Sequence, residues 1–171
     1  MMKLPLVALV LIMANPLHAA DLFYMKNSSL YVMHDVEQGK TESRLLDTSV
    51  TGYVADAGAV LYVKGPTLYL IPDTRTPKPV RLDGAVAGFK LDDGTIAYLK
   101  GDALHVRKVS DEATVASRTI QNSKGISSFD LADGTIVFIK NVTTLYRVTD
   151  IDRGLAERVV YPVGEVQVSG K

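Results

Sequence analysis

The chain has 171 residues, of which 19 are basic and 19 acidic, so its formal net charge is zero. Such a balance offers no electrostatic footprint for nucleic acid, and we therefore expect no nucleic-acid partner. The absence of cysteine excludes disulfides and thiolate metal sites. A domain of about 150 residues can bury roughly 70% of its unfolded surface, so one core suffices to stabilise it.

The first twenty residues have the order of a secretory signal peptide. A short basic start precedes an apolar run from Leu4 to Ala14, which is too short to cross a bilayer that needs about 20 residues. We expect cleavage after Ala20, with Ala19 as the alternative, and a single domain over residues 21–171. An uncleaved membrane anchor is the competing interpretation. The prediction is a periplasmic or secreted protein without a later membrane span.

One sequence motif recurs four times along the rest of the chain. It is clearest at 93–101 and 133–141, and weaker copies occupy 57–65 and 22–27. The lysines that end these copies, Lys26, Lys64, Lys100 and Lys140, are separated by 38, 36 and 40 residues. A repeat of about 40 residues indicates a solenoid, a propeller or an array.

Each repeat has the pattern of four short strands. Runs such as Ile136–Ile139 lack polar alternation, which is typical of strands buried on both faces. Asp-Gly pairs before these runs predict hairpin turns, and Lys-Gly or Lys-Asn pairs after them predict a second turn. An arginine-containing outer strand and an inner strand with small residues complete the unit. No sustained helical spacing occurs, so the fold class is all-β and the unit matches a propeller blade.

Closure of the ring follows from the two ends of the domain. The first repeat begins directly at its second strand, Leu22 to Lys26, and lacks an inner strand. Residues 163–168 align with the inner strand at 50–55. We therefore predict a monomeric four-bladed propeller in which the C-terminal strand joins the first blade and hides its edge. The alternative is that the four repeats form half of a larger ring completed by a second chain.

The order of Asp-Gly turn, apolar-aromatic strand, short turn and Leu-Tyr strand resembles the blades of bacterial TolB-like propellers. It is also similar to propeller repeats of the low-density-lipoprotein-receptor type. The resemblance covers residues 21–171 at the level of single blades, although TolB has an additional N-terminal domain. It implies a periplasmic module that binds other proteins or envelope components.

Catalytic and metal-binding patterns are missing from the sequence of the expected domain. Its two histidines, His34 and His105, occupy offset positions in different repeats. His105 stands where other repeats have tyrosine, which predicts a packing role, and His34 at a strand end is expected to be solvated. No nucleophile–base–acid set or spaced ligand set is apparent. We expect a protein that is not an enzyme and that needs neither metal nor cofactor.

The repeated lysines are the candidate binding residues. Propeller geometry would place Lys26, Lys64, Lys100 and Lys140 in a rough ring around one mouth, with Tyr24, Tyr62 and Tyr98 two residues earlier on the same strand face. Such a ring could hold phosphate, a carboxylate or an acidic peptide. The alternative is that each lysine lays its stem over the aromatic ring and keeps its charge in water.

The sequence therefore predicts an exported, non-enzymatic propeller that engages a protein or cell-envelope partner through one face. The alternative function is a small-ligand or glycan binder with repeated equivalent sites.

Overall fold

Tight turns with left-handed backbone dihedrals define the hairpins of each repeat. In the computed structural model, which describes residues 21–112 and 114–159, both residues of Asp93-Gly94 have positive φ (44° and 64°), as do those of Asp133-Gly134 (49° and 67°). This is the dihedral signature of the type I′ turn, whose twist matches that of the flanking strands. Ala57-Gly58 adopts the same geometry without the aspartate. The predicted turns are thus confirmed.

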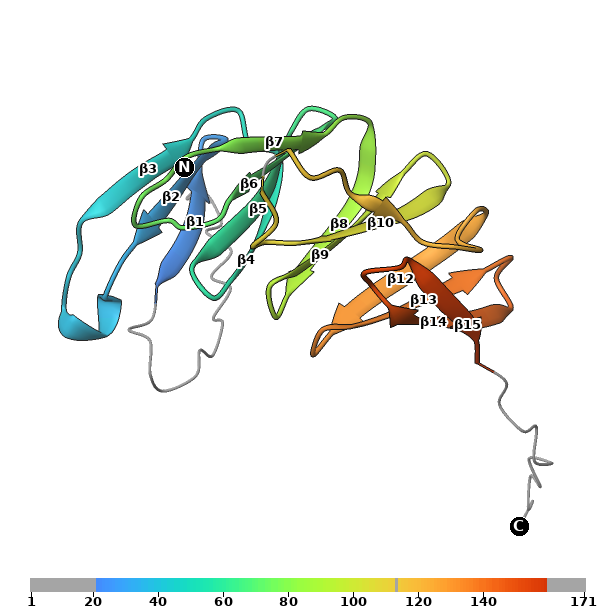
Figure 1. Ribbon diagram of the computed structural model, residues 1–171. Coiled ribbons are helices and arrows are strands. Elements are labelled where there is room, and N and C mark those ends of the chain that lie inside the picture. Colours follow the sequence, from blue (N-terminus) through green and yellow to red (C-terminus); the bar gives the residue numbers. More distant parts are fainter. Residues whose placement is uncertain (1–20, 113, 160–171) are drawn as a thin grey trace, which may run out of the picture.

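The strands form four antiparallel sheets in chain order, shown in Figure 1 as successive colours. The first sheet is three-stranded and the other three are four-stranded, each built from consecutive strands. A short 3₁₀ helix, η1 (Val36–Gln38), lies between the second and third strands. The strands are β1 (Leu22–Lys26), β2 (Ser29–Met33) and β3 (Ser43–Asp47); β4 (Gly52–Asp56), β5 (Ala59–Lys64), β6 (Thr67–Ile71) and β7 (Val80–Asp83); β8 (Val86–Asp92), β9 (Thr95–Lys100), β10 (Ala103–Lys108) and β11 (Arg118–Thr119); β12 (Ile126–Ala132), β13 (Thr135–Lys140), β14 (Thr144–Asp150) and β15 (Leu155–Arg158).

These sheets confirm the predicted repeat unit, with one local difference. The first sheet has no inner strand among the described residues, as its sequence predicted. The arginine of the fourth repeat, Arg158, ends β15 (Leu155–Arg158), whereas the arginines of β3, β7 and β11 lie at or near the start of their strands. The pairing of Tyr146 with Arg158 places the arginine at the end of that strand, because the turn at 151–154 is tighter than the corresponding connections.

The core lies between neighbouring sheets and consists of one apolar cluster at each of the three junctions. Along β5, Val60 and Tyr62 pack toward the first sheet, whereas Leu61 and Val63 pack toward the third. Successive strand residues point to opposite faces, so both sets are covered only when a sheet is sandwiched on both sides. This explains why the second strands are apolar without alternation.

Inner strands of consecutive sheets also interlock through a glycine and an aromatic ring. A Cβ atom at Gly52 would lie 3.9 Å from the ring of Phe89 in the next sheet, and one at Gly88 would lie 3.8 Å from the ring of Phe129. Gly52 and Gly88 therefore face an aromatic ring of the next sheet at van der Waals distance, in keeping with close approach of neighbouring sheets at this position.

The described sheets form an open arc, not a closed ring. Figure 1 shows the first sheet and the fourth at opposite ends, with the second and third between them. The predicted closing strand, 163–168, lies outside the described residues, as does the predicted signal peptide, 1–20. Closure of a four-bladed ring is therefore not part of the described structure, and the observed curvature leaves both end sheets without a neighbour on one face.

Candidate functional site

The four repeated lysines occupy equivalent positions at one rim of the arc. Each ends the second strand of its repeat, which is β1 in the first sheet, and faces the start of the next strand across a tight hairpin, in the pairs Lys26–Ser29, Lys64–Thr67, Lys100–Ala103 and Lys140–Thr144. We call these four hairpins the lysine rim. The aromatic residue two positions earlier stacks on the ring of the third strand in every sheet, with centroids 5.0 to 5.5 Å apart.

At this rim, an aspartate of the first sheet binds a tyrosine and a lysine of the second sheet, an arrangement that we call the aspartate clasp. Asp47, at the end of β3, accepts a hydrogen bond of 2.6 Å from the hydroxyl of Tyr62 and one of 2.9 Å from Nζ of Lys64. Burial alone would raise the pKa of Asp47, but these hydrogen bonds outweigh it and hold the pKa below its ordinary value. Burial and the adjacent carboxylate also raise the pKa of Tyr62. The phenol therefore stays a donor and the carboxylate an acceptor.

The same clasp joins the second and third sheets, 36 residues further along the chain. Asp83, at the end of β7, accepts hydrogen bonds from the hydroxyl of Tyr98 (3.0 Å) and from Nζ of Lys100 (2.7 Å). Burial raises the pKa of Tyr98 to about 12. Burial also opposes ionisation of Asp83, yet its hydrogen bonds to Lys100, Gly84 and Tyr98 lower its pKa overall.

The other two sheets lack this clasp among the described residues. In the fourth sheet the aromatic is Phe138, which has no hydroxyl, and the outer strand β11 is followed by Ile120 and Gln121 in place of aspartate. In the first sheet the hydroxyl of Tyr24 donates instead to Oγ of Ser43 within the same sheet (2.7 Å). Neither Lys26 nor Lys140 forms an ion pair with any residue of the described ranges.

The predicted ligand-binding set therefore divides into two groups. Tyr62 and Tyr98 are fully buried and cannot touch a ligand, and Lys64 and Lys100 are already neutralised by aspartates. Lys26, Lys140 and Tyr24 remain accessible at the two ends of the arc. Nζ of Lys64 also lies 5.9 Å from the centroid of Tyr69, in keeping with the alternative in which lysine stems cover aromatic rings. The aspartate partners were missed, although their 36-residue spacing matches that of the lysines.

A second polar cluster lies at the opposite end of the same strands, between the first and second sheets. Arg75 donates a hydrogen bond of 2.9 Å to Asp35, and Lys40 donates one of 2.7 Å to the other oxygen of that carboxylate. The Arg75 and Lys40 hydrogen bonds hold the pKa of Asp35 down at about 2. Beside it, Nδ1 of His34 lies 3.0 Å from Asp21. The cluster fastens the loop around η1 to the second sheet.

Both histidines of the expected domain have structural neighbours. His105 stacks on Tyr98 at 5.3 Å, which confirms its predicted packing role, and burial lowers its pKa. His34 was expected to be solvated, but its side chain is only 19% exposed and its Nε2 faces the carbonyl oxygen of Thr74 at 3.3 Å. The expectation was wrong because the loop after β6 folds back over the strand end. Since both nitrogens of His34 face protein oxygens, neither is placed to accept a proton from a catalytic nucleophile.

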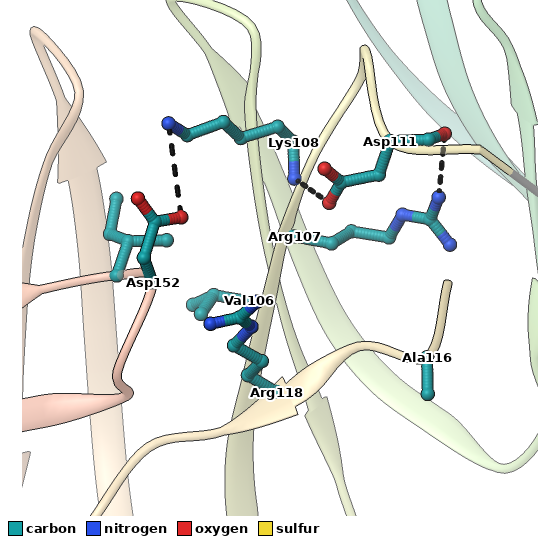
Figure 2. Close-up of a pocket in the computed structure, with 8 residues that line it drawn as sticks. Val106, Arg107, Lys108, Asp111, Ala116, Arg118 and Asp152 are labelled. Atoms are coloured by element: carbon teal, nitrogen blue, oxygen red, sulfur yellow. Dashed lines mark hydrogen bonds and ion pairs between the residues drawn. The ribbon is translucent and has the colours of Figure 1, made fainter.

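A small hollow lies between the third and fourth sheets, shown in Figure 2. Its wall includes Arg107, which is 4% exposed and donates to the carbonyl oxygens of Asp111, Glu112 and Val115 at 3.0 to 3.2 Å. Across the hollow, Lys108 Nζ and Asp152 approach to 3.9 Å. A volume of about 20 Å³ holds roughly one water molecule, so the hollow is a seam between sheets and not a ligand pocket.

Within residues 21–112 and 114–159, no cluster of histidine and acidic side chains has the arrangement of a metal site. The same part of the chain contains no helix with the length and apolarity required to cross a bilayer.

No family model matches the chain, and no curated protein matches it. The TolB-like resemblance thus stays a prediction. Solved structures do match in fold. The N-terminal domain of Nup159 is 12% identical over 82% of this chain and 40% of its own length, with a TM-score of 0.56. Kluyveromyces lactis Hsv2 is 13% identical over 80% of this chain and 45% of its own length, with a TM-score of 0.57. Human WBSCR16 is 12% identical over 83% of this chain and 51% of its own length, with a TM-score of 0.55.

Nup159 and Hsv2 are β-propellers, so the likeness shows that the four sheets are arranged as propeller blades. The chain spans less than half the length of these two proteins. One of the solved Saccharomyces cerevisiae structures contains Dbp5 bound to Nup159.

Proposed function

We propose that this chain is an exported, non-enzymatic binding module that engages a protein or cell-envelope partner through the lysine rim of a β-propeller. The observation that carries the proposal is the unequal state of the four lysines. Lys64 and Lys100 are held by aspartates, whereas Lys26 and Lys140 present charged groups without a counter-ion in the described ranges. A partner with carboxylate or phosphate groups would supply the missing counter-charge.

The same inequality favours one extended partner over several identical small ligands. A glycan or small-ligand binder with four equivalent sites needs the same groups in each blade. Here the aromatic hydroxyl is absent at Phe138, and the aspartate clasp occurs at only two of the four lysines. A partner that spans several blades tolerates such differences, because each blade then contributes a separate contact. That Nup159, a propeller of the same fold, binds the protein Dbp5 is consistent with this mode.

A non-enzymatic role is supported by the engagement of the side chains that would perform chemistry. His105 is stacked in the core, both nitrogens of His34 face protein oxygens, and the sequence has no cysteine. Histidine is the side chain used most often for acid–base catalysis, and cysteine is among the strongest side-chain nucleophiles.

Capture from an envelope extract tests the binding role and its face together. The bait is the chain without residues 1–20, and the rim variant combines Lys26→Gln with Lys140→Gln. The matched control combines Lys78→Gln with Lys108→Gln, because Lys78 lies in the connection between β6 and β7 and Lys108 ends β10, both away from the lysine rim. We expect one stoichiometric partner that the rim variant loses and the control retains. Equal capture by all three baits would overturn the choice of face, and no partner at all would overturn the binding role.

Export has its own test. Expression of the complete chain in a bacterial host should yield a product outside the cytoplasm whose first residue is Asp21, measured by N-terminal sequencing. A product that retains residues 1–20 in the membrane fraction would favour the anchor interpretation.

We also infer that the inner strand missing from the first sheet is supplied by residues 163–168. Deletion of residues 163–171 should then lower the melting temperature, since the edge of β1 would be left without a partner. An unchanged melting temperature would contradict this completion.

A further inference from the structure

The first sheet, at one end of the arc in Figure 1, has a face that lies outside the three junctions of the core. Phe23 and Met25 of β1 pack into the junction with the second sheet, so the residues that alternate with them point the other way. Residues paired across neighbouring strands share a face. We call this surface the end face, and it consists of Leu22, Tyr24, Lys26, Tyr31, Met33 and Leu45.

The equivalent face of the second sheet is covered by a neighbouring blade. The cross-strand pairs Leu22–Met33, Tyr24–Tyr31 and Lys26–Ser29 of the first sheet match Val60–Ile71, Tyr62–Tyr69 and Lys64–Thr67 of the second. Val60, Tyr62 and Ile71 are fully buried against the first sheet. Their three counterparts in the first sheet are only half-buried. The end face is therefore a blade-junction surface that has no covering blade among the described residues.

The opposite end of the arc has a different surface. Arg147 of β14 stands where the second and third sheets have Leu70 and Val106, which are buried against the following sheet. Arg147 instead binds Glu157 at 2.6 Å, and both side chains are more than half exposed. Such a polar outer face is typical of a terminal repeat that contacts water. Of the six residues that define the end face, in contrast, only Lys26 is charged.

The aspartate clasp indicates which polar group the end face would receive. At the next junction, the covering sheet supplies Asp47 to both Tyr62 and Lys64. Tyr24 and Lys26 hold the same two positions, but no carboxylate of the described ranges contacts them. The hydroxyl of Tyr24 donates to Oγ of Ser43 at an exposed site instead. A covering surface that brought a carboxylate to Lys26 would complete a third clasp.

Lys140, the other lysine without an ion pair in residues 21–112 and 114–159, has a different setting. It ends β13, in which Phe138 is fully buried against the third sheet, so the face beside this lysine is already covered. Phe138 also has no hydroxyl to share a carboxylate with the lysine. Of these two lysines, Lys26 is the one that lies beside an uncovered face and a tyrosine.

We propose that the end face is the docking surface for a partner protein, which lays an apolar sheet face on the first sheet and binds Lys26 through an aspartate or glutamate. The contact would repeat a junction that the chain already forms twice within itself. Apolar area provides the contact surface, and the single cation fixes its register. The inference rests on the proposed binding role and narrows it from the lysine rim to one end of the arc. It concerns the face of the first sheet and not its edge.

Zero-length cross-linking tests the carboxylate. A carbodiimide joins a lysine amine to a carboxylate in direct contact, and the fold contains two standards: Lys64 lies 2.9 Å from Asp47, and Lys100 lies 2.7 Å from Asp83. The chain without its expected signal peptide is treated in an envelope extract, and mass spectrometry identifies the linked peptides. We expect an amide between Lys26 and an aspartate or glutamate of another protein. With both standards formed, a Lys26 that is unlinked, or linked to an acid of this same sequence, would overturn the proposal.

The affinity of the partner identified by that link is then measured with purified proteins. Lys26→Gln should weaken binding by at least about tenfold, because the partner's carboxylate loses its counter-charge. Lys140→Gln is the matched control and should leave the affinity unchanged. An unchanged affinity in K26Q would overturn the proposal.

The apolar part of the end face has a test of its own. Leu45→Glu should weaken binding by at least about a hundredfold, because it places an unpaired carboxylate against the partner's apolar surface. Leu45 is 48% exposed, so the change leaves the core of the fold in place. Val115→Glu is the control, since Val115 is 39% exposed on the loop after β10, and its affinity should match that of the parent. Equal affinities in L45E and V115E would overturn the docking surface.

The outcomes separate this inference from the binding role on which it rests. A partner that is lost with K140Q and retained with K26Q would overturn the end face alone and leave the lysine rim as the binding face. The absence of any partner would overturn both. Binding to phosphatidylglycerol vesicles that K26Q abolishes, without an amide at Lys26, would indicate a lipid surface in place of a protein and would also overturn the proposal.

Discussion

The hydroxyl of Tyr98 donates a 3.0 Å hydrogen bond to Asp83, a residue of the preceding sheet. The contact connects two blades through a polar group at an otherwise apolar junction, and Lys100 completes it from the rim. Its counterpart at Asp47 has the same three residue types in the same order. The rim lysines of the two central blades are therefore parts of inter-blade clasps, which leaves the end blades as the accessible part of the rim.

Removal of the clasp aspartate should destabilise the fold. In Asp83→Ala, the buried hydroxyl of Tyr98 loses its acceptor and Lys100 loses its ion pair, and we expect a loss of about 1–3 kcal/mol in the free energy of unfolding. Urea denaturation measures it. Asp130→Ala is the control, because its pair with Lys90 is exposed on both sides and should be worth less than about 1 kcal/mol. Equal losses in the two variants would contradict the clasp.

The clasps should also make stability sensitive to acid. The folded-state pKa values of Asp47 and Asp83 lie below their ordinary values. Such carboxylates contribute stability above the unfolded-state pKa, about 3.9, and lose it as pH falls through the lower folded-state value. We expect the melting temperature of the parent to fall below about pH 4 more steeply than that of an Asp47→Asn/Asp83→Asn variant. Parallel profiles would show that the two aspartates are not linked to folding.

His105 should make the folding stability depend on pH in a second, higher pH range. Burial lowers its pKa in the folded state, so protonation near the ordinary value of about 6.5 disfavours folding. Stability is then complete above that pH and decreases as pH falls toward the folded-state pKa. Other sheets have Tyr31, Tyr69 and Tyr146 at this stacked position. His105→Tyr should therefore fold and should flatten the melting profile over this window; a destabilised variant would contradict equivalence of the position.

Gly154, in the turn before β15, should be the least replaceable of the described glycines. Its φ is 67°, and a Cβ there would lie 2.8 Å from the carbonyl oxygen of Thr119 in the third sheet. Its own carbonyl accepts a hydrogen bond of 2.8 Å from Gln121, so the clash would fall on a contact between blades. We expect Gly154→Ala to cost more than about 2 kcal/mol by chemical denaturation.

Gly101→Ala provides the comparison for that measurement. Gly101 has a similar φ of 61° but open space around it, so its replacement reports backbone strain alone, about 1 kcal/mol. A cost at Gly154 no larger than this would show that the approach of Thr119 does not matter.

The sequence alone determined the repeat, its strands and its turns, because these depend on local features. Three features recur along the repeats: turns with positive φ such as Asp93-Gly94, apolar runs such as Ile136–Ile139, and stacked aromatic rings. Each of them can be recognised within a single repeat. The packing role of His105 followed in the same way from its place in the repeat.

Only the tertiary structure showed the contacts between repeats. The clasps join residues 15 and 17 positions apart on different sheets, so the neutral state of Lys64 and Lys100 depends on blade stacking. The burial of His34 depends on a loop 40 residues away. Ring closure depends on the angle between successive sheets, which side-chain volumes at each junction set and which strand patterns do not encode. For that reason the repeat unit was predictable, whereas the open arc and its two free ends were not.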